Sequence, residues 1–257
     1  MNVFQQLYKS IYSPKDIAKF RFQGIGKTIR FIFLLALISI LPVAVQFVSF
    51  TTGALDTLRD SVVTELPSFS IEDGTLSTGQ SKPLKIEKEN MAIILDDTGQ
   101  MKEGTLDKNQ NTIAFLQEEF VVINQGNVQS SSYSLFGDTV LTKDGLLNIV
   151  DTLIDLRWIL IPVALFILYL FTSAMTFLKI TIFALIGMML ANILKRNVQY
   201  RQSFRITAYS ATVSTLFFTL MELLQTTIPA APLLDWFVIT LILYLVVKEI
   251  PKRKIRP

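Results

Sequence analysis

Long runs of apolar residues dominate the pattern of this 257-residue chain. The first run, residues 31–50, carries no charged side chain. It has the roughly 20 residues that a helix needs to cross a hydrocarbon core about 30 Å thick. Pro42 lies inside the run, and we expect a kink there rather than a helix end because apolar residues continue on both sides. The pattern therefore predicts one transmembrane helix at residues 31–50.

Three further apolar regions follow, and we group them as a helical membrane bundle at residues 156–250. The first of them, residues 156–194, would be about 58 Å long as one straight helix, nearly twice the hydrocarbon thickness. We therefore expect it to cross once and then to bend or to lie in the interface. The predicted elements are a span at 157–172, a bent or interfacial segment at 175–194, and spans at 206–228 and 233–248.

Residues 51–155 have the composition of a small folded domain. Short β-rich runs alternate there with turn signals such as Asp-Gly and Thr-Gly. A helix is expected from Thr142, as its N-cap, into the next span. The strands are expected at residues 68–71, 84–87, 91–95, 113–115 and 120–123. The segment is therefore predicted to be a small α+β domain.

Charge indicates the orientation of these elements. Lys and Arg concentrate before the first span, between the second and third apolar regions, and in the tail at residues 251–257. Residues 52–152 instead hold 16 Asp or Glu against 7 Lys or Arg, on a chain of formal net charge +3. Basic segments stay on the cytoplasmic side. We thus expect a polytopic α-helical protein of the cell membrane, with about four spans, cytoplasmic termini and an extracytoplasmic α+β domain inserted between the first and second spans.

One alternative topology remains open at residues 156–194. Two full crossings would fit the length of this region and would give five spans in total. The C-terminus would then lie outside, and its five basic residues would be on the disfavoured side of the membrane. We favour the four-span arrangement for that reason.

Composition limits the chemistry of any site. Hydrophobic residues make up 51% of the chain and charged residues 18%, and there is neither Cys nor His. Disulfide, thiolate and imidazole chemistry are therefore excluded, and with them the commonest general base and transition-metal ligand. We expect no enzyme, no cofactor and no metal site.

The string AIILDDTG, residues 92–99, ends a β-rich run with Asp-Thr-Gly, the local pattern of an aspartic-protease half-site. Such an enzyme needs two carboxylates that share one proton, so a single copy acts only in a homodimer. The alternative is a strand that ends in a turn, with Asp97 capping backbone donors and Gly99 at a positive φ. We favour the turn and keep a hydrolase built on Asp97 as a remote alternative.

Glu222 and Lys179 are the intramembrane polar candidates. A carboxylate near mid-bilayer costs about 2.5–3.5 kcal/mol on insertion scales, so Glu222 should face the bundle interior, be protonated or have a partner. Lys179 is the obvious opposite charge, and together they would make a proton- or ion-coupled site. Alternatively, Glu222 lies near the outer interface, where its cost falls. Asp235 with Trp236 fits interfacial anchoring.

Residues 1–30 interleave basic and aromatic side chains before the first span. Apolar residues recur at helical spacing up to Tyr12, and Ser13 is placed to cap a second helix with Pro14 at its first position. We expect a two-helix interfacial collar on the cytoplasmic face, neither a cleaved signal peptide nor a nucleic-acid site.

This collar is expected to meet a lipid bilayer with anionic head groups. Ile17, Phe20 and Phe22 would enter the lipid boundary, and the basic side chains would reach the head groups. The candidate contacts with lipid or with a protein partner are Ser13, Pro14, Lys15, Lys19 and Arg21.

The opening string YKSIYSPKDIAKFRFQGIGKTI, the strings LPSFSIEDGTLS and IILDDTG, and the closing helices resemble an uncharacterised family of Gram-positive membrane proteins labelled maltodextrin-utilization protein, YvdJ-like. The resemblance covers essentially the whole chain. Residues 200–217 are also similar to the membrane region of the Yip-type superfamily, whose eukaryotic members work through protein partners. The label implies a place in sugar uptake but no reaction, so no catalytic residue is carried over.

Three hypotheses for function follow. In the first, a non-enzymatic integral membrane protein acts as an accessory or regulatory partner of another membrane complex, such as a carbohydrate or maltodextrin uptake system. In the second, a small transporter or ion-coupled protein uses Glu222. The third is the hydrolase built on Asp97.

Overall fold

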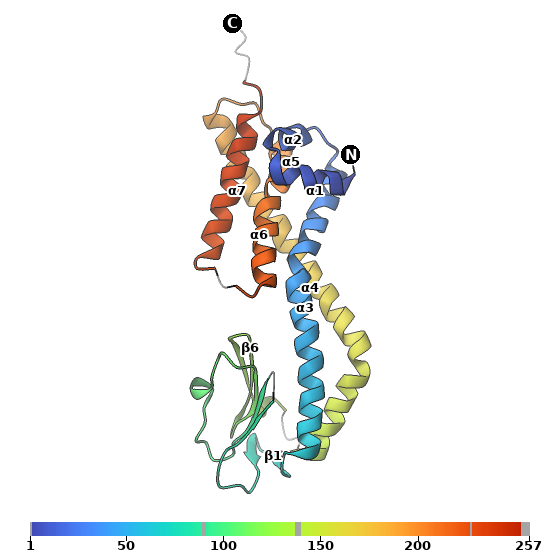
Figure 1. Ribbon diagram of the computed structural model, residues 1–257, viewed down its shortest axis with the longest axis vertical. Helices are drawn as coiled ribbons and strands as arrows, with labels where there is room; N and C mark the ends of the chain where they lie inside the picture. Colours follow the sequence, from blue (N-terminus) through green and yellow to red (C-terminus); the bar gives the residue numbers. More distant parts are fainter. Residues whose placement is uncertain (1, 89–90, 137–139, 227, 253–257) are drawn as a thin grey trace. The chain divides into compact units, whose positions relative to one another are not determined.

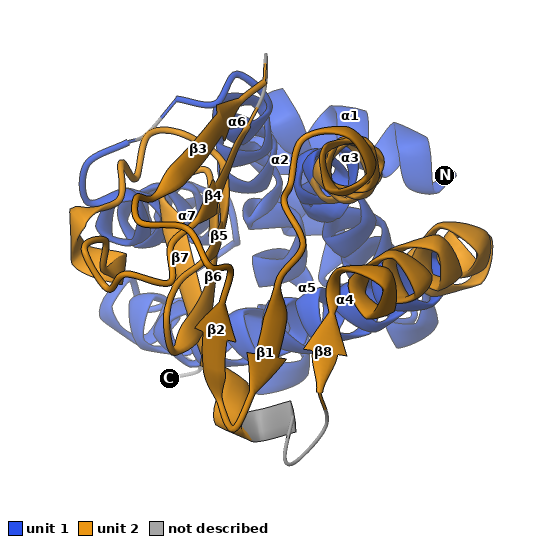
Figure 2. Ribbon diagram, turned by 90° about the horizontal axis from the view of Figure 1, so that it is seen from below, with its two compact units in different colours: residues 1–46, 162–257 blue, residues 47–161 orange. Residues whose placement is uncertain are grey.

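The computed structural model describes residues 2–88, 91–136, 140–226 and 228–252 (Figure 1). It divides into two units, which Figure 2 shows in different colours. Residues 1–46 and 162–257 form the helical unit, and residues 47–161 form the sheet unit. Helices α3 and α4 contribute residues to both units.

Four stretches are long and apolar enough to cross a membrane, as expected. They are α3 (Ile25–Thr64), α4 (Lys143–Ile193), the pair α5 (Tyr200–Ser210) and α6 (Thr212–Leu223), and α7 (Ala231–Lys248). Two short helices precede them, α1 (Val3–Tyr12) and α2 (Pro14–Phe20). The small sheet region lies in the sequence between α3 and α4, as the pattern predicted.

The first two long helices extend beyond their predicted spans. Helix α3 has 40 residues with Pro42 inside it. Helix α4 is one continuous helix of 51 residues with Pro162 inside it, and it runs to Ile193 through most of the bent or interfacial segment expected at 175–194. The Thr176 hydroxyl donates to the Thr172 carbonyl oxygen one turn earlier (2.8 Å), a bond that can be made within a continuous helix and that tends to bend it. A single candidate span is found in α4.

The sheet unit contains two sheets. The larger has the strand order β3-β4-β5-β6-β7, in which only β4 and β5 are parallel. Its strands are β3 (Leu84–Glu87), β4 (Ala92–Leu95), β5 (Thr112–Phe115), β6 (Glu119–Asn124) and β7 (Asn127–Ser132). The smaller, β2-β1-β8, is formed by β1 (Ser70–Glu72), β2 (Thr75–Ser77) and β8 (Leu141–Thr142).

Two 3-10 turns, Glu103–Thr105 and Tyr133–Phe136, complete the sheet unit. Five of its eight strands agree with predicted runs to within two residues at each end, whereas β2, β7 and β8 were not predicted. Helix α4 begins at Lys143, and the Thr142 hydroxyl accepts from the Gly145 N–H at 3.2 Å. The predicted N-cap at Thr142 is thus confirmed.

The helical unit has a core to which α2, α3, α4, α5 and α7 all contribute. Tyr209 lies at its centre, fully buried, with its ring centroid 4.2 Å from that of Phe31. Its hydroxyl donates to the side-chain oxygens of Gln6 (2.9 Å) and Gln23 (3.3 Å). This buried polar contact connects α1 to α5 and to the segment before α3.

Candidate functional site

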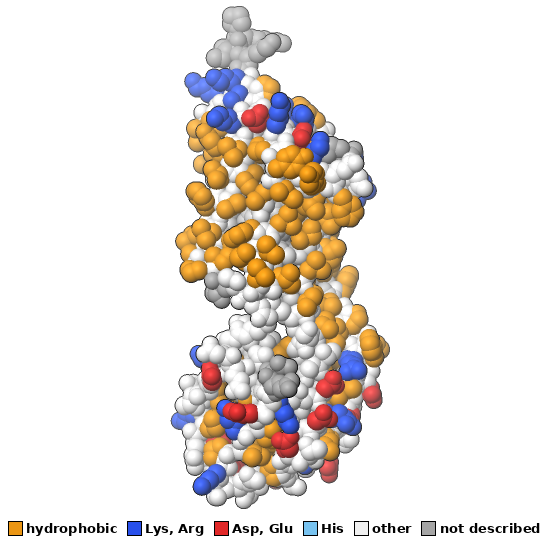
Figure 3. Space-filling model, viewed as in Figure 1, with side chains coloured by type: hydrophobic (Ala, Val, Ile, Leu, Met, Phe, Trp, Pro, Cys, Tyr) orange, Lys and Arg blue, Asp and Glu red, His pale blue; other side chains and the backbone are white. Residues whose placement is uncertain are grey.

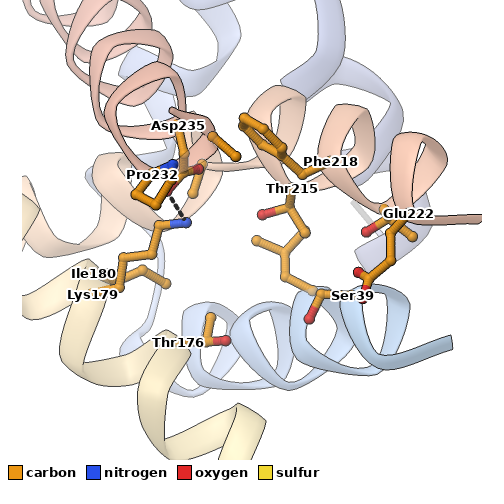
Figure 4. Close-up of a pocket in the computed structure, with 13 residues that line it drawn as sticks. Ser39, Thr176, Lys179, Ile180, Thr215, Phe218, Glu222, Pro232 and Asp235 are labelled. Atoms are coloured by element: carbon orange, nitrogen blue, oxygen red, sulfur yellow. Dashed lines mark ion pairs between the residues drawn. The ribbon is translucent and has the colours of Figure 1, made fainter. Parts of the chain in front are cut away.

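A pocket of about 360 Å³ lies within the helical unit, lined by residues of α3, α4, α6 and α7 (Figure 4). Apolar side chains such as Leu35 and Phe218 form part of its wall. Charged and hydroxyl side chains form the rest. These polar lining residues are Ser39, Thr176, Lys179, Thr215, Thr219, Glu222 and Asp235.

An ion pair occupies one side of the pocket. Lys179 Nζ on α4 lies 2.7 Å from Asp235 Oδ2 on α7. The other carboxylate oxygen, Oδ1, accepts a hydrogen bond of 2.5 Å from the Ser214 hydroxyl on α6. Both oxygens of Asp235 are therefore engaged, and three helices are joined through one carboxylate. Pairing of this kind offsets the cost of placing charges among apolar helices.

Glu222 lines the same pocket from the last turn of α6. In Figure 4 it lies across the pocket from the ion pair, next to Ser39. Its backbone carbonyl accepts from Gln46 Nε2 at 3.3 Å. Its carboxylate has no ion pair or hydrogen bond to any residue that the structure describes. Lys179 and Asp235 pair with each other, so Glu222, which is an exposed residue, is the pocket carboxylate without a cation partner among the described residues.

Lys179 was expected to pair with Glu222, and this expectation is wrong: its partner is Asp235. The interpretation of Asp235 as an interfacial anchor missed the pair for the same reason. Register between separate helices cannot be obtained from spacing along the chain. One signal was present, because both acids lie in or beside apolar runs, and Lys179 lies deep within such a run whereas Arg157 lies at the start of one.

The predicted collar residues lie in α1 and α2. The Ser13 hydroxyl accepts from the Asp16 N–H at 3.3 Å, and Pro14 is the first residue of α2. The hydrogen bond from Lys19, at 2.9 Å, together with those from Ser13 and the charge of Lys9, holds the pKa of Asp16 below its usual value against the opposing effect of burial. Lys15 and Lys19 are exposed.

Arg21 ends α2, and its guanidinium donates to the Ala18 carbonyl oxygen at 2.6 Å. Partial burial lowers its pKa. The expectation that Ile17 and Phe20 enter lipid is wrong, because both pack in the core of the helical unit and are at most 4% exposed. Phe22, at 69% exposed, remains available for such a contact.

Helix α1 has an inverted distribution of polarity. Its buried side chains are the polar Gln6 and Ser10, and the Ser10 hydroxyl donates to the Gln6 carbonyl oxygen at 2.7 Å. Its exposed side chains are mainly apolar, with Phe4 and Tyr8 both 66% exposed. A helix at a water-facing surface would show the opposite distribution.

Asp97 takes part in a turn of the sheet unit. Its Oδ2 accepts from both the N–H and the hydroxyl of Thr78, each at 2.7 Å. Partial burial acts to raise the pKa of Asp97, but these hydrogen bonds prevail and the pKa is lowered. Gly99 has φ +70°, as the turn interpretation requires. The strand therefore ends in a turn, as expected, but its cap is Asp96 rather than Asp97: the Asp96 carboxylate accepts from the N–H groups of Thr98 (2.9 Å) and Met101 (2.6 Å).

Within residues 2–88, 91–136, 140–226 and 228–252, no group of three or more Asp, Glu, His or Cys side chains lies close enough together to hold a metal ion.

A family described as "Protein of unknown function (DUF1189)" matches residues 4–247. The chain belongs to this family. No curated protein and no solved structure matches it. The match covers nearly the whole chain, in agreement with the expected membership of an uncharacterised family, and it assigns no activity to any residue.

Proposed function

We propose that this protein is a non-enzymatic, multi-pass protein of the cell membrane that acts as an accessory or regulatory partner of another membrane complex. The observation that carries the proposal is the open edge strand β7 in the sheet unit. A partner strand would pair with this edge and extend the sheet, a common mode of peptide recognition.

Strand β7 is an edge strand, and on its outer side the backbone groups have no backbone partner among the residues that the structure describes. It pairs with β6 through a two-residue hairpin at Gln125 and Gly126, both with positive φ. The Tyr133 N–H donates to the Glu118 carbonyl oxygen at 3.1 Å, so these two residues form a hydrogen-bonded pair. From this pair, hydrogen-bonded and non-hydrogen-bonded residue pairs alternate along β6 and β7. Gln129 therefore bonds to β6, whereas the backbone N–H and C=O of Ser130 point outward.

The two edges of the five-stranded sheet differ in their protection. On β3, Lys85 and Glu87 form an ion pair of 2.7 Å, and charged side chains on an edge discourage pairing with another chain. The sequence of β7, NVQSSS, has no charge and no Pro, and five of its six residues are exposed within the described structure. The contrast supports β7 as the edge that receives a partner.

The proposed topology places both termini in the cytoplasm and the sheet unit outside. The distribution of Lys and Arg along the sequence supports this orientation. In Figure 3, hydrophobic side chains cover much of the visible face of the helical unit, and Lys and Arg gather at its end near the N-terminal helices. The exposed apolar side of α1 then faces the acyl chains, and neighbouring basic groups meet anionic head groups.

A carbohydrate-uptake complex is the first candidate partner. The basis is the maltodextrin-utilization label of the YvdJ-like proteins that the chain resembles, together with the Yip-type similarity of residues 200–217, since Yip-type proteins work through protein partners. Helices α5 and α6 cover this Yip-like stretch.

Photo-crosslinking in the native membrane tests the proposal. A crosslinking residue at Ser131, on β7, is expected to capture a subunit of a carbohydrate-uptake complex, and one at Lys85, on β3, is not. Ser130→Pro removes one outward N–H without touching the β6 ladder and should abolish the crosslink. The proposal fails if the Lys85 position gives the same product, or if the Ser131 product is only a second copy of this chain.

A further inference from the structure

The polar pocket of the helical unit has a charge balance that points to a ligand. The carboxylate of Asp235 is engaged on both oxygens, by Lys179 and by Ser214. Glu222 contributes a second carboxylate to the same pocket without a cation among the described residues. A ligand that pairs with the Glu222 carboxylate would carry one positive charge and approach on the Glu222 side of the pocket.

The hydroxyl groups of the pocket supply further hydrogen-bonding positions. Thr219 Oγ1 is buried and has no hydrogen-bond partner in the described structure. The Ser39 hydroxyl donates to the Ala36 carbonyl oxygen at 3.1 Å, which leaves its lone pairs free to accept. A primary ammonium has three N–H donors, which match one carboxylate and two hydroxyl oxygens.

The size of the pocket favours a molecule over a bare ion. A volume of about 360 Å³ lies within the range of small-molecule sites, roughly 300–1,000 Å³. Leu35, Ile180 and Phe218 provide apolar wall for a short hydrocarbon chain. One uncommitted carboxylate is also a poor donor set for a metal cation, which takes about six oxygen ligands.

We propose that this pocket binds a small primary ammonium ligand, with Glu222 as its counter-ion and Thr219 and Ser39 as hydrogen-bond acceptors. A primary ammonium group can come from two sources, a free short-chain amine and the ethanolamine head group of a phospholipid. The site is independent of strand addition at β7, so either proposal can fail alone.

Thermal unfolding of the full-length protein tests the site, in nanodiscs of phosphatidylcholine and phosphatidylglycerol. Butylammonium is expected to raise Tm in a saturable manner, because a ligand that binds only the folded state stabilises it by mass action. Butan-1-ol has the same length without the charge and should give no such shift. Adding phosphatidylethanolamine identifies the source: competition with butylammonium assigns the lipid head group, and its absence assigns a free amine.

Matched variants locate the ligand. Glu222→Gln should weaken butylammonium binding about tenfold or more, since it removes the charge-assisted hydrogen bond. Glu249→Gln makes the same change at an exposed position outside the pocket and should leave binding unchanged. Thr219→Val keeps the side-chain volume and should also weaken binding, which covers the case of an unfolded Glu222 variant. Equal shifts from butan-1-ol, or unchanged affinity in both pocket variants, would overturn the proposal.

Discussion

Gly187, in α4, is a point of close helix packing, and its substitution by Ala is expected to destabilise the helical unit. An added Cβ would lie 2.4 Å from Ser203 Oγ and 3.1 Å from Leu243 Cδ2. The Ser203 hydroxyl is buried and donates to the Ala184 carbonyl oxygen at 2.6 Å. The new methyl group must displace this hydroxyl or separate the helices.

Three contributions determine how much Gly187→Ala lowers the free energy of unfolding. Loss of a buried hydrogen bond costs about 1–3 kcal/mol. Overpacking costs about 1–3 kcal/mol. The higher helix propensity of Ala returns about 1 kcal/mol. The expected net loss for Gly187→Ala is about 1–5 kcal/mol, which lowers Tm by several degrees.

Tryptophan fluorescence during thermal unfolding in detergent measures this effect, since the Trp236 ring centroid on α7 lies 5.4 Å from that of Phe183 on α4. Gly53→Ala is the matched control: nothing lies within 4 Å of its added Cβ, so Tm should hold or rise. Ser203→Ala removes the obstructing oxygen, so the double variant with Gly187→Ala should cost less than the sum of the two single changes. Equal Tm values for the Gly53 and Gly187 variants would refute the packing argument.

Three further predictions concern polar groups. Lys179→Met should lower stability by about 3 kcal/mol because it leaves Asp235 without its cation, and the double change with Asp235→Leu should recover most of the loss in the same melting assay. Tyr209→Phe should cost about 1–3 kcal/mol, since the buried side-chain oxygen of Gln6 loses its donor. The folded-state pKa of Asp97 is depressed, so its contribution is fully present above the unfolded pKa of about 3.9 and is lost as pH falls through the lower folded value. Asp97→Asn should flatten the pH dependence of stability below about pH 4. An unchanged pH dependence in that range would contradict a stabilising role for the hydrogen bonds between Asp97 and Thr78.

The fold was predictable where local pattern and burial agree. Strand β3 alternates apolar with charged residues and β5 is a short β-rich run, and Ile86, Ile113 and Phe115 from these strands lie in the core of the sheet unit. Strand β7 was missed because it has one apolar residue, Val128. It forms because the hairpin at Gln125 and Gly126 places it beside β6. The parallel pairing of β4 with β5 depends on tertiary context that no local pattern reports.

The candidate site was predictable in its residues but not in its pairing. Charges in apolar segments are costly, so Glu222 and Lys179 were identified before any geometry was known. Asp235 lies in the first turns of α7, where water at an interface could satisfy it equally well, and its pairing depends on how α4 and α7 pack. Ile17 was expected to face lipid but is buried in the protein core. Periodicity along the sequence identifies the apolar face of a helix, but it does not show whether lipid or protein covers that face.

The pairing of β1 with β8 joins Ser70 to Thr142, so the three-stranded sheet brackets almost the whole inserted segment. Strand β8 immediately precedes α4, and β1 follows the end of α3 closely. During synthesis, about 70 further residues must therefore be made before β8, the second partner of β1, is available. Closing so long a loop delays the pairing of β1 with β8. The order of events in synthesis follows from this: the three-stranded sheet is completed only as the second long helix begins to be made, so folding of the sheet unit is tied to synthesis of α4.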